Sequence, residues 1–223
     1  MPDDLRLLPH LWTPTRVGAL ELRNRVMVSG HTVLYAEDGL LGDRHVAYFA
    51  ERARGGAALV VIEQQAAHPA GRNYLAGCRA YDPAVVPRYA RLAEAVHAHG
   101  AAVFAQLFCG GAQGQGTMYL DSWRALMAPS AIASTQFQEL PAEMDEGDIA
   151  SVTEGFATSA AHAQAGGLDG VEIHAAHSQL LGAFLSPAFN RRTDGYGGDL
   201  ARRCRIVLEI GEAVRRHSRR SGG

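Results

Sequence analysis

The sequence has few cysteines, little net charge and no long apolar run, and each shortage excludes a class of protein. Cys78, Cys109 and Cys204 are odd in number and form no CxxC pair, which argues against a disulfide framework and against a zinc or iron–sulfur site. A formal charge of -2 over 223 residues gives no argument for binding nucleic acid or an anionic membrane. No uncharged apolar run approaches the ~18 residues of a membrane span. We therefore expect a cytoplasmic protein that acts on a small-molecule substrate.

Two common catalytic motifs are also absent, the GxSxG nucleophile elbow and the GxxxxGK(S/T) phosphate loop. What the sequence does contain is a strand pattern followed by a helix pattern, four times over. We predict strands at 25–29, 57–62, 101–107 and 170–174. We predict helices at 43–54, 82–99, 148–165 and 199–217, each with its apolar residues on one face.

The connections before and after the strands differ in length. Three of the predicted helices end shortly before a strand, at Gly55-Gly56, Gly100 and Gly166-Gly167, because glycine takes the left-handed C-cap conformation at little steric cost. After the strands the connections are longer, about thirteen, twenty and forty residues. Short αβ loops with long βα loops indicate a (β/α) barrel or a doubly wound sheet, with function at the carboxyl ends of the strands.

Polar side chains gather where the predicted strands end. They are neutral hydrogen-bonding groups and imidazoles, together with one carboxyl: Ser29, Gly30, His31, Thr32, Glu63, Gln64, Gln106, His174 and His177. No pair of acids stands at glycosidase spacing. Amide and hydroxyl groups of this kind suit the edge of a planar heterocycle, where they donate and accept hydrogen bonds in the plane of the ring.

Several segments together resemble one enzyme family. The longest is HAAHSQLLGAFLSPAFNRRTDGYGG, from His174 to Gly198, and it resembles the signature of the old yellow enzyme family of FMN-dependent NAD(P)H oxidoreductases. LWTPTRVGALELRNRVMVS, GGAALVVIEQQAAHPAGR and VFAQLF resemble the opening, the second strand and the third strand of that family. The resemblance extends over residues 11–217.

The resemblance implies an α/β fold, a partial (β/α)8 TIM barrel made of the first four βα units and an N-terminal hairpin that plugs the barrel floor. The family barrel has eight strands over at least ~250 residues, whereas four are predicted here. We therefore expect residues 1–223 to form a single, truncated FMN-binding domain, with 218–223 as a frayed tail.

The resemblance also assigns a cofactor and the residues that contact it. FMN would be reduced by NAD(P)H and would in turn reduce an activated alkene, such as an enone or enoyl compound, or a related acceptor. Thr32 would lie at the O4/N5 edge of the flavin, and Gln106 would hydrogen-bond its pyrimidine ring. Ser29, Gly30 and Gln64 would line the isoalloxazine.

By the same resemblance, His174 and His177 would anchor the carbonyl oxygen of the substrate, or an anion, above the flavin. Two donors on one oxygen stabilise the enolate that forms on hydride transfer. Gln179 stands where the family usually has a tyrosine that protonates the substrate. An amide cannot serve as a general acid near neutral pH, so the proton would come from water or from Tyr35. Cys109 and Ala112 replace a histidine and an arginine of the family pattern; the isolated Cys109 is interpreted as a small buried residue.

Several interpretations of these residues stay open. His174 and His177 could form a hydrogen-bonded loop pair or, as His-x-x-His, ligate a metal, although no third ligand is in view and we predict no metal site. Glu63 could pair with an arginine or contact a ligand. His45 is interpreted as structural or solvated, and the polar block 190–198 as a salt-bridged loop that fixes the barrel rim.

A second hypothesis concerns the whole chain. Four parallel strands leave two open edges and apolar surface that further strands would cover. The chain could therefore be a non-catalytic half-barrel that needs a second copy or a complementing C-terminal half to bind flavin.

Overall fold

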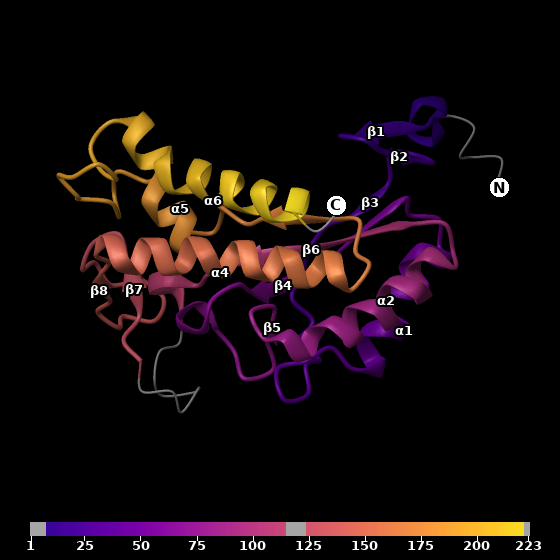
Figure 1. Cartoon of the computed structure of the whole chain (residues 1–223), viewed down its shortest axis with the longest axis horizontal. Coiled ribbons are helices and arrows are strands. Elements are labelled where there is room, and N and C mark those ends of the chain that lie inside the picture. The colour runs from indigo at the N-terminus through magenta and orange to yellow at the C-terminus, as the bar shows by residue number, and fades with distance from the viewer. Residues whose placement is uncertain (1–7, 115–123, 221–223) are drawn as a thin grey trace.

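A computed structural model describes residues 8–114 and 124–220. Its main sheet is parallel, and the path β3–β4–β6–β9 follows the order of the chain (Figure 1). These four strands are β3 (Met27–Val28), β4 (Leu59–Ala66), β6 (Ala102–Phe108) and β9 (Gly170–Ile173). A doubly wound sheet reverses its strand order within its first four strands, and no reversal occurs in this path. The sheet is therefore an arc of a (β/α) barrel, as one of the two predicted architectures requires.

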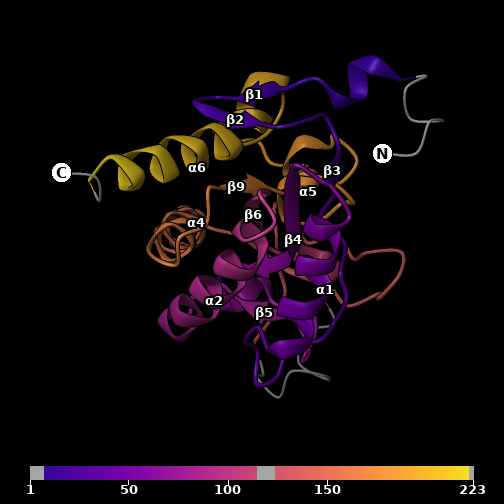
Figure 2. The same ribbon diagram turned by 90° about the vertical axis from the view of Figure 1, so that its right-hand side faces the viewer.

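Three helices cover the outer face of the arc, α1 (Asp43–Arg54), α2 (Val86–His97) and α4 (Glu146–Ala165) (Figure 2). Alternation along the strands explains why, since successive side chains point to opposite faces. Val60 and Ile62 belong to the large core beneath the helices. Val61 belongs to a smaller cluster on the other face.

The smaller cluster holds the N-terminal hairpin against the sheet. Strands β1 (Thr15–Val17) and β2 (Leu20–Leu22) pair antiparallel across Gly18, which has a φ of 60°. Leu22 packs with Leu59 and Val61 at the amino-terminal end of β4. This arrangement is the floor plug that the sequence predicts.

The strand boundaries differ from those predicted. β3 is only Met27–Val28, because it lies at the edge of the sheet and pairs with β4 alone along the main path. β4 continues four residues beyond Ile62, because both β6 and the short β5 (Cys78–Arg79) pair with its carboxyl end. The register between β4 and β6 shifts between Ile62 and Gln64.

The helix termini follow their predicted signals closely. Gly56, Gly100 and Gly167 have φ values of 105°, 69° and 77°, as left-handed C-caps require. Helix α4 begins two residues before the predicted Asp148, because Asp145 caps it and accepts the backbone N–H of Asp148. The predicted helix at 82–99 is a 3-10 turn, Pro83–Val85, followed directly by α2.

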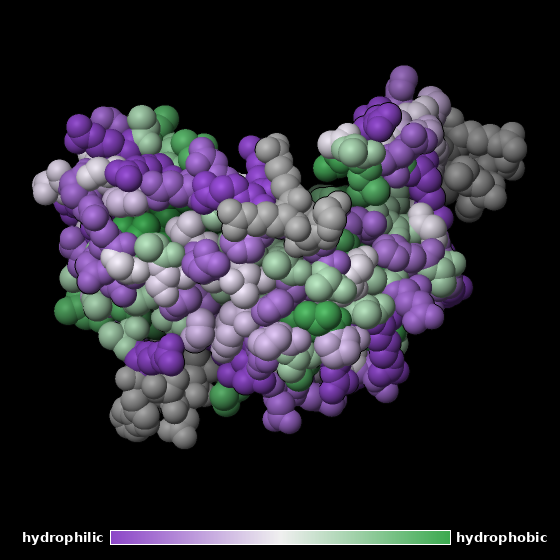
Figure 3. All heavy atoms as spheres, in the orientation of Figure 1, coloured by the Kyte–Doolittle hydropathy of each residue, from purple (hydrophilic) through white to green (hydrophobic). Residues whose placement is uncertain are grey.

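The C-terminal part contains a helix that the sequence reasoning missed. The apolar run LLGAFL forms α5 (Leu180–Leu185), which packs against α6 (Leu200–Arg220). Helix α6 continues to Arg220, so residues 218–220 of the predicted frayed tail at 218–223 are helical. Residues 221–223 lie outside the described residues. Figure 3 shows mostly hydrophilic residues along the outer side of α6. In the described part of the chain, no helix is both long and apolar enough to cross a membrane.

The polar block 190–198 is scaffolding, as predicted. Arg192 forms an ion pair with Asp194 at 2.5 Å and donates to the carbonyl oxygens of Pro129 and Met144. Asn190 donates to the backbone carbonyls of Phe184, before the loop, and of Tyr196, within it. These contacts tie the loop to β7 (Met127–Ala128) and β8 (Ala142–Glu143). The remaining described elements are 3-10 turns at Pro9–Trp12, Pro69–Gly71 and Gly111–Gln113.

The core beneath α4 predicts a contrast between two substitutions on that helix. Phe156 is fully buried, so Phe156→Ala should lower the free energy of unfolding by about 3–5 kcal/mol. Glu154 is exposed, and its carboxylate lies 3.5 Å from Nε2 of His217 at the surface. Glu154→Ala should therefore lower the free energy of unfolding by about 1 kcal/mol or less. Urea unfolding of both variants measures the difference, and equal losses would contradict the packing described.

Candidate functional site

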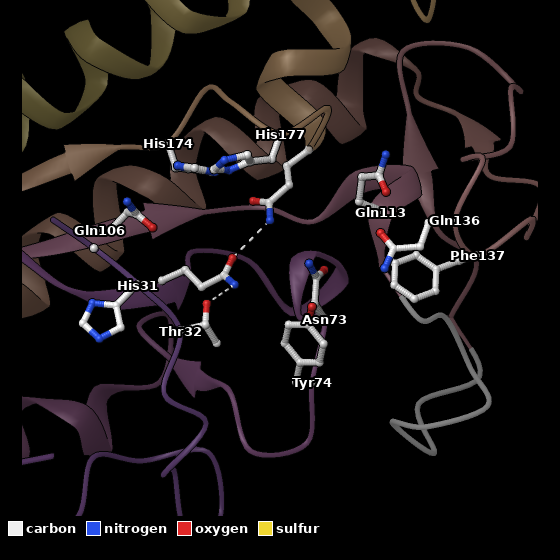
Figure 4. A pocket seen from close by; sticks show the side chains of 13 residues that line it. His31, Thr32, Asn73, Tyr74, Gln106, Gln113, Gln136, Phe137, His174 and His177 are labelled. Atoms are coloured by element: carbon white, nitrogen blue, oxygen red, sulfur yellow. Dashed lines mark hydrogen bonds between the residues drawn. The ribbon is translucent and has the colours of Figure 1, made fainter.

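A cavity of about 390 Å³ opens at the carboxyl ends of the strands. Six of the seven predicted site residues line it: Gly30, Thr32, Gln64, Gln106, His174 and His177 (Figure 4). Residues far apart in the sequence thus meet at one edge of the sheet, because parallel strands end on the same side. Seven further residues complete the lining: His31, Asn73, Tyr74, Gln113, Gln136, Phe137 and Gln179.

Ser29 is the predicted residue that lies apart from this lining. It is exposed, and its carbonyl oxygen lies 3.2 Å from Nδ1 of His31. Since β3 ends at Val28, the chain leaves the sheet before Ser29, and the next residues turn toward the cavity instead.

The register shift in β4 decides which side chains of that strand reach the cavity. Val61 faces inward, and strict alternation would send Glu63 inward after it. The irregularity between Ile62 and Gln64 adds a residue, so Glu63 faces helix α1 and Gln64 lines the cavity. Irregularities of this kind re-aim side chains next to active sites.

Three polar side chains form one hydrogen-bonded chain across the cavity wall. Gln179 donates through Nε2 to Oε1 of Gln64 at 3.1 Å. Gln64 donates through Nε2 to Oγ1 of Thr32 at 2.5 Å, and both bonds are drawn in Figure 4. The chain joins the loop after β3 and the loop after β9 through strand β4, which carries Gln64, so it fixes the orientation of both amides. The Oε1 atom of Gln179 is buried and has no partner among the described residues.

Gln106 is oriented by the neighbouring strand. Its Nε2 donates to Oε1 of Glu172 on β9 at 2.6 Å, which leaves its own carbonyl oxygen as an acceptor. Gly30 lies close beside it, and a Cβ at that position would lie 2.6 Å from Nε2 of Gln106. A larger residue there would displace the amide of Gln106, so Gly30 leaves room for the hydrogen bond between Gln106 and Glu172.

The two histidines lie against each other at the end of β9. Nδ1 of His177 and Nε2 of His174 are 3.1 Å apart, and the ring centroids are separated by 5.1 Å. His174 is buried and His177 is exposed. Burial and the proximity of His177 lower the pKa of His174, while Glu172 acts in the opposite direction. A ligand oxygen between the two nitrogens would replace their mutual hydrogen bond with two bonds to itself.

Glu63 has neither of the predicted partners. Its Oε1 lies 2.5 Å from Nε2 of His45, and its Oε2 accepts the backbone N–H groups of Val33 and Leu34 at 2.7 and 3.1 Å. Glu63 and His45 are both fully buried. Sequence reasoning missed the pair because it depends on the register shift, which turns Glu63 toward α1.

His45, Glu63 and Cys78 also form the one cluster among the described residues with the spacing of metal ligands, their ligand atoms lying within 4.8 Å of one another. Both nitrogens of His45 and both carboxyl oxygens of Glu63 already take part in hydrogen bonds. The cluster is therefore satisfied as a hydrogen-bonding network. Within the described chain, no Cys, Asp, Glu or further His joins His174 and His177 in a group with the spacing of metal ligands.

Two further expectations can be compared with the structure. Cys109 is buried against Gly71, and burial raises the pKa of its thiol to about 12; it is the small buried residue that was predicted. The ring of Tyr35 packs edge-on against His45 and Tyr48 and is not part of the cavity lining. It is therefore badly placed as the proton donor that the sequence suggested.

The character of the lining suits the ring system of a flavin. Among the described residues, it holds amides, one hydroxyl of threonine, one phenol, three imidazoles and one phenyl ring, with no arginine, aspartate or glutamate. The unpartnered Oε1 of Gln179 and the free acceptor of Gln106 are matched by a heterocycle that carries both N–H and C=O groups. A phosphate group finds no cationic partner in this lining.

Comparison with known proteins agrees with the geometry. The NADH:flavin oxidoreductase / NADH oxidase family matches residues 10–220. NADH oxidase of Thermoanaerobacter brockii is 37% identical over 204 residues, which are 91% of this chain and 31% of that protein. The multifunctional alkene reductase/demethylase OYE of Caballeronia cordobensis is 33% identical over 207 residues, 92% of this chain and 30% of that protein.

Solved structures give the same result. Morphinone reductase superposes with a TM-score of 0.87 at 29% identity, over 92% of this chain and 58% of that one. The chain thus spans about a third of the length of the first curated relatives, and its fold is the corresponding part of their barrel. The resemblance to old yellow enzyme is confirmed: this chain belongs to the NADH:flavin oxidoreductase / NADH oxidase family, whose members use FMN.

Proposed function

We propose that this chain binds FMN and takes part in the reduction of an activated alkene, such as an enone or enoyl compound, with NAD(P)H as reductant. The observation that carries the proposal is the cavity at the strand ends. In it, side-chain amides oriented by hydrogen bonds lie beside the pair His174 and His177. The alkene reductase named above, 33% identical to the chain, supports the choice of substrate class. A reducing cytoplasm remains the expected compartment.

Five of the predicted residues have a task in this proposal. Gln106 and Thr32 hydrogen-bond the polar edge of the flavin, and Gln64 holds Thr32 in place from behind. His174 and His177 donate to the carbonyl oxygen of the substrate and stabilise negative charge that develops there. The bound flavin would supply the hydride. Since Gln179 is an amide, the proton for the substrate comes from elsewhere, with water as the simplest donor.

The half-barrel alternative rests on two features of the same structure. The path β3–β4–β6–β9 ends in two open edges, and the described lining has no cation for a phosphate. A second copy of the chain or a separate C-terminal half could supply both a pairing strand and a phosphate site. In this view residues 1–223 form a single domain that supplies the ring-contacting part of the site and binds flavin only together with the second half.

Flavin binding separates these possibilities. The folded chain should take up FMN and riboflavin with dissociation constants within about threefold of each other, since the cavity offers nothing to the phosphate. Visible absorbance after gel filtration measures uptake, and the oligomeric mass is recorded on the same sample. Absence of flavin uptake by the folded chain contradicts the proposal. Uptake only after addition of a fragment carrying further strands supports the half-barrel alternative.

The histidine pair predicts a specific loss of ligand binding. Phenols bound over oxidised flavin give a long-wavelength charge-transfer band. The variant carrying both His174→Ala and His177→Ala should lose this band and bind phenol about 30-fold more weakly, because two hydrogen bonds of about 1 kcal/mol each are removed. Gln136→Ala, elsewhere in the cavity wall, serves as control. An unchanged charge-transfer band in the double variant would contradict the proposed binding of the ligand oxygen by His174 and His177.

The lowered pKa of His174 predicts a pH dependence of stability. Unfolding returns this pKa to its ordinary value near 6.5, so the unfolded state takes up a proton more readily and gains stability from it. The resulting loss of folding stability is absent well above pH 6.5 and grows as the pH falls below it. It reaches its full size below the pKa of His174 in the folded state. Stability should therefore fall less steeply from about pH 7 to pH 5 in His174→Asn. The free energy of unfolding is measured by urea titration at several pH values. The same dependence on pH in wild type and variant would contradict the lowered pKa of His174.

A further inference from the structure

Glu63 and His45 form a network that ends on the loop carrying Thr32. The two backbone N–H groups bound by Glu63 belong to Val33 and Leu34, directly after Thr32 in the chain. Leu34 has a φ of 55°, a conformation in which residues other than glycine are disfavoured. Two N–H groups converging on one carboxyl oxygen hold the loop in this conformation.

The hydrogen bonds also fix the protonation of the histidine. Nδ1 of His45 lies 3.2 Å from the backbone N–H of Gly42 and accepts from it. Nδ1 therefore carries no proton, and Nε2 carries the proton that it donates to Glu63. His45 is thus neutral in this arrangement, and the charge of the Glu63 carboxylate is stabilised by three N–H donors but not cancelled.

That charge is close to the cavity wall. Glu63 is followed by Gln64, and the N–H groups it binds follow Thr32; both neighbours line the cavity. Within the described chain, Glu63 has no ion-pair partner other than His45. A fixed negative charge next to a low-dielectric site disfavours further negative charge there. Reduction adds electrons to a flavin, so the oxidised ring is favoured.

We propose that His45 and Glu63 form a buried anionic clamp, which orients the loop carrying Thr32 and lowers the reduction potential of a flavin bound in the cavity. The second half of this statement rests on the proposed function, whereas the first half does not. A further contact from α1 assists the clamp, since the hydroxyl of Tyr48 lies 2.5 Å from Nε2 of His31 in the same loop. His45 and Glu63 are positioning residues, which orient the loop that carries Thr32.

Two substitutions of His45 separate its two hydrogen bonds. In His45→Gln the amide nitrogen can replace Nε2 and donate to Glu63, while the acceptor for Gly42 is lost. In His45→Asn the amide oxygen can replace Nδ1 and accept from Gly42, while the donor to Glu63 is lost. Amide hydrogen exchange at Val33 and Leu34, measured on the flavin-free chain, should be about tenfold faster in His45→Asn and close to wild type in His45→Gln. Equal exchange in both variants would overturn the clamp.

The contribution of charge is tested on the flavin-loaded chain. Glu63→Gln places an amide NH₂ against Nε2–H of His45 and should disturb both the loop and the potential. In the double variant His45→Gln with Glu63→Gln, the amide of residue 63 can donate to the amide oxygen of residue 45. The double variant should therefore keep slow exchange at Val33 and Leu34 yet raise the potential, relative to His45→Gln alone, by about 30 mV, a tenfold change in the ratio of affinities for reduced and oxidised flavin.

The two parts of the proposal fail separately. If the wild-type chain takes up no flavin, the proposed function fails, and the exchange measurements still decide whether the loop is clamped. If flavin binds and the double variant has the same potential as His45→Gln, the electrostatic role of Glu63 is refuted while the proposed function stands. Loss of folding in Glu63→Gln leaves the comparison between His45→Gln and the double variant intact.

Discussion

One irregularity in the pairing of β4 with β6 determines what the rest of the site can be. The register shift between Ile62 and Gln64 turns Glu63 outward to His45 and brings Gln64 into the cavity. Without it, a carboxylate would stand in the cavity wall, and the amide chain from Gln179 to Thr32 could not form. The same shift lets the strand continue beyond its apolar part, because polar residues 63–65 find partners on both faces of the sheet.

The sequence was informative where side-chain chemistry follows directly from chain order. Strands that alternate with helices run parallel, so the sequence alone places Gln106, His174 and Thr32 at the carboxyl edge of one sheet. The glycine C-caps also follow from local signals, whereas the hairpin plug was expected from the family resemblance. By contrast, the Glu63–His45 pair depends on a one-residue shift that no periodicity reveals, and α5 is too short for its pattern to differ from an apolar loop.

The described lining of the cavity holds no carboxylate, lysine or arginine. Amides, a hydroxyl and imidazoles face the interior, which suits an aromatic ring that both donates and accepts hydrogen bonds. The carboxylates of Glu63 and Glu172 are outside this lining, and each orients a part of the wall: Glu172 the amide of Gln106, and Glu63 the loop of Thr32. The wall is thus preorganised by its supporting residues, as sites on rigid strands generally are.

The central claim is that the four strand ends assemble a flavin-ring site within this chain. The most direct test is a nuclear magnetic resonance titration of the labelled chain with riboflavin, following the side-chain amide signals of Gln64, Gln106 and Gln179 and the backbone signal of Thr32. The account predicts that these four signals shift together and saturate at one equivalent. Shifts confined to other parts of the chain, or no saturable shift in the folded protein, would contradict it.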